Sequence, residues 1–161
     1  MACWIWLIGA VFSGAAIGAA PDDPAILLKQ ADSIKSANNA GFVEILEKLR
    51  GASVDLSPRQ RLYLRYLTAW QTGYLGKYED AVPEFEAIIK DADDEVLRFR
   101  AGISAVNVQA LAGRYEPAYL RLSQLLDQLP QIADEEARVQ AKMVAAIRPG
   151  KATGIKMRVS V

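Results

Sequence analysis

Two short stretches of the chain repeat the same pattern 37 residues apart, and this repetition limits the accessible folds more than any other feature. The stretches are GKYEDAV, at 76–82, and GRYEPAY, at 113–119. Both place a glycine, a basic residue, a tyrosine and a glutamate in the same order. Similarity at a fixed period of this length is typical of stacked repeats rather than of a single closed globule. The sequence therefore favours a repeat protein, and with it a binding role.

The region from Pro24 to Ile147 shows the apolar spacing of helices rather than the alternation of β-strands. Apolar residues recur three and four positions apart, as in Leu27, Ala31 and Ile34. Glycine, proline, asparagine and aspartate interrupt these runs, which predicts helices near 23–36, 40–50, 58–74, 78–91, 94–111, 115–129 and 133–147. Because the connections are short, we expect an all-α fold of antiparallel helical hairpins.

The repeated stretches also suggest how the helices of a hairpin are joined. Each glycine should end one helix in the left-handed conformation, and the alanine five residues later should let two helices approach closely. This pattern resembles the tetratricopeptide repeat, with its Gly-x-Tyr-x-x-Ala turn, a large apolar residue four positions on and a proline near the end. The matching residues are Gly76, Tyr78, Ala81 and Phe85, and then Gly113, Tyr115, Ala118, Leu122 and Pro130. The resemblance implies a short tetratricopeptide-like solenoid, with Tyr115 packed between its own hairpin and the preceding one.

The first twenty residues, MACWIWLIGAVFSGAAIGAA, carry no charge and end in small residues. This order is typical of a secretory signal peptide, and about twenty apolar residues can also span a bilayer as an anchor. A helix buried in the fold is a third interpretation, but it would need cover on every side. We expect residues 1–20 to be a signal peptide or an anchor, and residues 23–147 to be a repeat domain in or facing the periplasm.

The composition changes abruptly at Arg148. All nineteen acidic residues precede it, so residues 1–147 carry a formal net charge of −4, whereas residues 148–161 hold four basic residues and no acid. The predicted helix 133–147 would also leave its apolar side chains, Val139 and Met143 among them, without a partner helix. We interpret 148–161 as a basic irregular tail left by a truncation or frame shift, with a native basic tail as the alternative.

The composition leaves few enzyme mechanisms. The chain has no histidine, and its one cysteine, Cys3, lies in the apolar leader, which disfavours His-based catalysis, disulfide frameworks and His/Cys metal sites. The acidic clusters at 93–95 and 134–136 could be paired catalytic carboxylates, but each opens a predicted helix, where acids cap free N–H groups. An acidic body also disfavours nucleic acid as a partner. We expect no enzyme activity, no cofactor, no metal and no nucleic-acid binding.

Two predicted helices carry candidate binding residues at helical spacing. These are Tyr63, Tyr66, Trp70 and Tyr74 on helix 58–74, and Arg100, Ser104 and Asn107 on helix 94–111. In a stacked array the first helices of the hairpins line a concave surface, so these side chains predict one groove for a protein or peptide partner or a small anionic ligand. Packing in the core is the alternative for such an aromatic stripe.

Two longer segments resemble a more specific family. LRYLTAWQTGYLGKYEDAVPEFEAII and LRFRAGISAVNVQALAGRYEPAYLRLSQLLDQLP are similar to the extracytoplasmic N-terminal region of bacterial membrane-bound diguanylate cyclases with a GGDEF output domain. The resemblance implies a non-catalytic sensor or interaction segment of a truncated receptor of this type. The chain has no GGDEF sequence, so no catalytic residue is implied. The alternative is a freestanding periplasmic adaptor that binds a protein or peptide partner.

Overall fold

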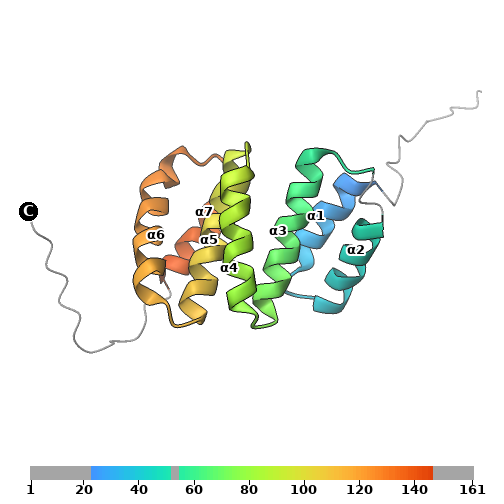
Figure 1. Cartoon of the computed structure of the whole chain (residues 1–161). Helices are drawn as coiled ribbons and strands as arrows, with labels where there is room; N and C mark the ends of the chain where they lie inside the picture. The colour runs from blue at the N-terminus through green and yellow to red at the C-terminus, as the bar shows by residue number, and fades with distance from the viewer. Residues whose placement is uncertain (1–22, 52–54, 147–161) are drawn as a thin grey trace, which may run out of the picture.

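The computed structural model describes residues 23–51 and 55–146, and in these ranges it consists of helices without strands (Figure 1). The helices are α1 (Pro24–Ile34), α2 (Asn39–Gly51), α3 (Pro58–Tyr74), α4 (Tyr78–Asp91), α5 (Glu95–Leu111), α6 (Tyr115–Gln128) and α7 (Glu135–Ala146), with a short 3-10 turn, η1 (Leu129–Gln131). The predicted all-α class is confirmed, and each predicted helix is present within a few residues of its expected bounds. The predictions for residues 1–20 and 148–161 lie outside the described residues.

Local chemistry explains where these helices begin and end. Asp94 caps α5 by accepting a hydrogen bond from the backbone N–H of Leu97 at 3.0 Å, and Asp134 accepts one from Ala137 at 2.7 Å. The capping interpretation of these two carboxylates is confirmed. Gly76 and Gly113 follow α3 and α5 with φ of +78° and +76°, the left-handed region that favours glycine. The predicted turns are therefore present at both repeated stretches.

The two repeated stretches are packed differently. Ala81 and Phe85 are fully buried in the first, and Tyr78 is half-buried against the core. In the second, Ala118 is buried, but Tyr115 is 52% exposed, so the prediction that Tyr115 packs in the core is wrong. The tyrosine begins α6 next to α7, and within the described residues α7 contributes little apolar cover, with only two of its residues buried. The other matching residues of that stretch are a half-buried Leu122 and an exposed Pro130.

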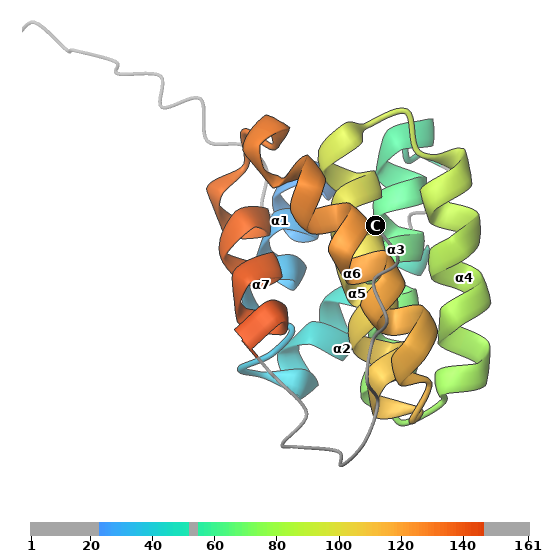
Figure 2. The same cartoon turned by 90° about the vertical axis from the view of Figure 1, so that its left-hand side faces the viewer.

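Each helix packs against its neighbour in the chain, and α3 also packs against both α1 and α5. Figure 2 shows α1 and α7 on one side of the molecule and α4 on the other. A large apolar cluster joins α1 to α5 around the buried rings of Phe42, Tyr66 and Phe85. A smaller cluster around Phe99 and Ile103 joins α5, α6 and α7.

The outer face of α7 remains open in the described part of the chain. Val139 and Met143 are 44% and 66% exposed, as expected for a helix that lacks a partner on this side. None of the helices in residues 23–51 and 55–146 is both long and apolar enough to cross a membrane.

Candidate functional site

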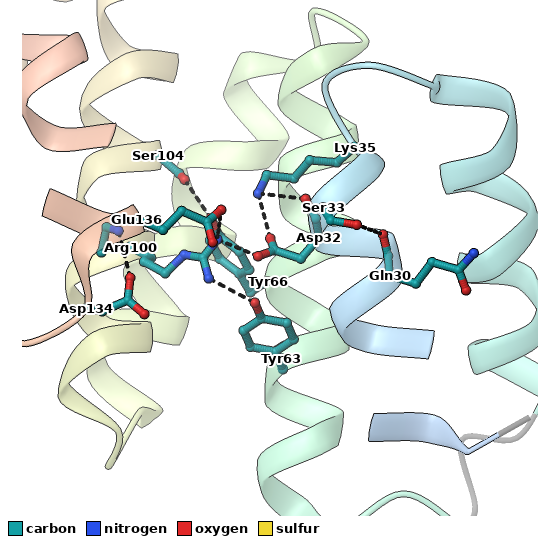
Figure 3. Close-up of polar contacts among 11 residues, drawn as sticks. Gln30, Asp32, Ser33, Lys35, Tyr63, Tyr66, Arg100, Ser104, Asp134 and Glu136 are labelled. Carbon is teal, nitrogen blue, oxygen red and sulfur yellow. Dashed lines mark hydrogen bonds and ion pairs between the residues drawn. The ribbon is translucent and has the colours of Figure 1, made fainter. Parts of the chain in front are cut away.

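Three charged side chains meet in the interior between α1 and α5 (Figure 3). Asp32 accepts a hydrogen bond from Arg100 Nη2 at 2.6 Å through one carboxylate oxygen, and from Lys35 Nζ at 2.5 Å through the other. The side chains of Arg100 and Asp32 are each 7% exposed, and that of Lys35 is 8% exposed. We call Lys35, Asp32 and Arg100 the ion triad; it has two positive charges and one negative charge.

Two tyrosines of α3 surround the guanidinium of Arg100. Its Nη1 donates to the hydroxyl oxygen of Tyr63 at 3.0 Å, and its Cζ lies 5.8 Å from the centre of the Tyr66 ring. The hydroxyl of Tyr66 in turn shares a hydrogen bond of 3.3 Å with Ser104. The triad is thus held by α1, α3 and α5 together.

The protonation states of this group follow from its surroundings. Burial alone would raise the pKa of Asp32, but the charges of Arg100 and Lys35 and their hydrogen bonds lower that pKa below its ordinary value. Burial would lower the pKa of Arg100, but Tyr66, Asp32 and Tyr63 raise it overall. Burial and the charge of Asp32 raise the pKa of Tyr63. At neutral pH Asp32 and Arg100 are therefore charged and the phenol of Tyr63 is neutral.

Arg100 and Asp32 lie in the wall of a cavity of about 580 Å³, which we call the polar cavity. The cavity lies over α1 and over the first turns of α3, α5 and α7. Its polar lining residues are Lys29, Asp32, Arg59, Gln60, Tyr63, Asp94, Arg100, Asp134 and Glu136. Its apolar lining residues are Ala25, Leu28, Val96 and Leu97. Arg59 forms an ion pair with Asp94, which occupies one cation and one carboxylate of the wall.

The predicted groove residues do not form one surface. Tyr63 and Arg100 line the polar cavity, whereas Trp70, Tyr74, Ser104 and Asn107 line a separate hollow of about 190 Å³. Tyr66 is fully buried in the core. The prediction of one continuous aromatic stripe is therefore wrong, because Tyr66 faces the interior packing of α3 against α4 and α5.

Trp70 belongs to the core as well as to the smaller hollow. Its ring meets Phe42 edge-on at a centroid distance of 5.6 Å, and it stacks on Tyr74 at 5.4 Å. Lys35 Nζ lies 6.0 Å from the same ring. The indole therefore helps to pack α2 against α3, in addition to being partly accessible from the hollow.

A third hollow, of about 290 Å³, lies between α5, α6 and α7 and has mostly apolar walls. Tyr115, Tyr119 and Leu122 contribute its α6 side, and Val144 contributes its α7 side. This hollow accounts for the exposure of Tyr115, whose ring faces it rather than the core.

Several residues of the ion triad and of the polar cavity were not predicted from the sequence. Asp32 and Lys35 are two of these residues. For Asp32 the sequence contains a signal, because the residue lies four positions after Leu28 and next to Ala31, on the apolar face of its helix. A charged residue on such a face needs a buried partner. For Glu136 the sequence indicates only a place in a helix-capping cluster.

The arrangement is suited to binding charged groups, because cations and carboxylates share one cavity with an apolar wall. Within the described ranges, no group of three or more histidine, cysteine or carboxylate side chains is placed to hold a metal ion. Comparisons with protein-family models, with curated proteins and with solved structures give no significant match to this chain.

Proposed function

We propose that the protein is a non-catalytic binding module whose ligand or partner enters the polar cavity. The observation that carries this proposal is the convergence of α1, α3, α5 and α7 on one cavity with exposed and buried charges. Its volume lies within the range of roughly 300–1,000 Å³ of small-molecule sites. The occupant is a peptide segment of a protein partner or a small charged ligand.

The proposal extends to the architecture. Left-handed glycines at 76 and 113, buried alanines at 81 and 118 and the packing of successive helices support antiparallel hairpins stacked as in tetratricopeptide repeats. In such an array the odd-numbered helices line the concave face, and the residues that line the polar cavity come from α1, α3 and α5 and from the start of α7. An experimental structure in which the α3–α4 and α5–α6 pairs pack with unrelated geometries would contradict it.

A thermal-shift screen of the full-length chain against peptides and small charged molecules tests the binding role. A ligand raises Tm because it binds the folded state only. Lys29→Gln in the cavity wall should abolish the shift, whereas Lys48→Gln, the same change at another exposed lysine, on α2 and outside the cavity, should preserve it. Ligands that stabilise both variants equally would place the binding site elsewhere.

The cellular role proposed is that of an extracytoplasmic sensor segment of a GGDEF-type receptor. Its support is the resemblance of 64–89 and 97–130 to the periplasmic sensor region of diguanylate cyclases. Residues 1–60 fused to a reporter that is active only after export should yield activity, and cytoplasmic retention would contradict this location. The second candidate is a freestanding periplasmic adaptor, favoured if translation of the downstream nucleotides in all three frames gives no membrane span and no GGDEF sequence.

A further inference from the structure

The ion triad has a surplus positive charge next to the polar cavity. Lys35 and Arg100 share the single carboxylate of Asp32. A second carboxylate near Arg100 belongs to Glu136, but it lies 3.6 Å from Nη2, beyond hydrogen-bonding distance, and its side chain is 69% exposed. A buried cation is stabilised by close, hydrogen-bonded anions. Arg100 therefore has one close carboxylate, that of Asp32, and a more distant one, that of Glu136.

The guanidinium of Arg100 also has unused donors. Of its five N–H groups, the described structure pairs one on Nη1 with Tyr63 and one on Nη2 with Asp32. The buried Nε has no hydrogen-bond partner. The side chain is only 7% exposed, yet it forms part of the cavity wall. Nη1 and Nη2 each keep one N–H group without a hydrogen bond in the described structure, and these two groups favour a ligand that brings a carboxylate to Arg100.

A carboxylate that could receive a cation lies beside the same guanidinium. Figure 3 shows Glu136, on the first turn of α7, beside Arg100, and Asp134 lines the same cavity. Asp134 uses one oxygen to cap α7, and Glu136 is mostly exposed to solvent. The cavity thus has a donor for an anion and an acceptor for a cation next to each other.

Resting on the proposed binding function, we propose that the polar cavity binds a free α-amino acid with an aliphatic side chain. The carboxylate of the ligand engages Arg100, and its ammonium engages Glu136. An α-amino acid carries both groups on one carbon atom, which matches the adjacency of Arg100 and Glu136 at 3.6 Å. One loose ion pair is thereby replaced by two charge-assisted contacts.

The apolar part of the cavity wall sets the preference for the side chain. Leu28, Val96 and Leu97 line the cavity with the charged groups. An aliphatic side chain can be removed from water against them, which adds to the binding free energy. L-Leucine is therefore the first probe.

Isothermal titration calorimetry of the full-length chain tests this proposal with three matched probes. These are L-leucine, N-acetyl-L-leucine, which lacks the ammonium, and 3-methylbutylamine, which lacks the carboxylate. Only L-leucine should bind at millimolar concentrations. Glu136→Gln should weaken its binding by at least about tenfold, because a hydrogen bond to a charged group is lost. Glu135→Gln, the same change at a neighbouring exposed position of α7 that does not line the cavity, should leave binding unchanged.

Three results would overturn the inference: no heat with L-leucine, equal binding of N-acetyl-L-leucine, or unchanged affinity in Glu136→Gln. The broader proposal is tested separately by the Lys29→Gln variant in the thermal-shift screen. A peptide whose stabilising effect is lost in Lys29→Gln would preserve the binding function while the amino-acid inference fails.

Discussion

The carboxylate of Asp32 neutralises two buried cations, so its removal should destabilise the fold strongly. Asp32→Asn keeps the size of the side chain but leaves Lys35 and Arg100 without their shared anion. Breaking a buried ion pair by removing one partner costs about 3–5 kcal/mol. The lower part of this range applies because Arg100 keeps the Tyr63 hydroxyl and the Tyr66 ring beside it. A loss of about 3 kcal/mol is a large share of the roughly 5–15 kcal/mol that stabilises a typical domain.

Urea unfolding of the full-length chain at neutral pH, followed by circular dichroism, measures this loss. Asp127→Asn makes the same change at an exposed position of α6 and should stay within about 0.5 kcal/mol of the wild type. Adding Arg100→Met to Asp32→Asn should recover part of the loss, because one uncompensated cation is removed. If Asp32→Asn costs no more than Asp127→Asn, the reasoning from the ion triad is refuted.

The same carboxylate should make this stability depend on pH in a defined direction. The pKa of Asp32 is lowered in the folded state from its ordinary value of 3.8. Its contribution to the free energy of unfolding is therefore complete above that ordinary value and is lost as the pH falls through the folded-state pKa. The difference between wild type and Asp32→Asn should be largest at neutral pH and should shrink on acidification. A difference that grows in acid would contradict the assignment.

Five further substitutions test the packing by urea or thermal unfolding. Gly76→Ala and Gly113→Ala should each cost about 1–2 kcal/mol, because both positions have positive φ; no loss would contradict the left-handed turns. Tyr115→Ala should cost less than about 1 kcal/mol, because the side chain is 52% exposed. Trp70→Ala should lower Tm clearly more than Tyr74→Ala, since Trp70 packs against the core and Tyr74 is 57% exposed. Equal decreases in Tm would contradict the packing of Trp70 in the core.

The helices could be predicted from the sequence because local chemistry sets their limits. Gly76 can adopt the left-handed conformation, and Asp94 caps α5. Both preferences depend on residues nearby in the chain and not on contacts with distant segments. Apolar residues spaced three and four apart also show which face of a helix is buried. These signals act within a few residues of one another, so they can be read in order along the chain.

The candidate site could be predicted only in part, because it depends on contacts between distant segments. Arg100 was identified as a site residue, but its partner Asp32 is 68 residues away, and helical spacing does not indicate which charge meets which. The spacing likewise placed Tyr66 and Trp70 on one stripe without showing that α4 and α5 cover Tyr66. Tyr115 has the same place in its motif as Tyr78, but Tyr78 packs against the large apolar cluster whereas Tyr115 is 52% exposed.

The ion triad ties the polar cavity to the fold as a whole. Arg100 of α5 contacts α3 through Tyr63, α1 through Asp32 and α7 through Glu136. In the proposed array of stacked repeats, each unit otherwise contacts only its neighbours, so stability would spread along the array through adjacent interfaces. A ligand that binds Arg100 and Glu136 adds its binding free energy to contacts among four helices at once. Occupation of the cavity would therefore favour one position of α7 relative to the other helices. This helix is otherwise attached to them by few buried side chains.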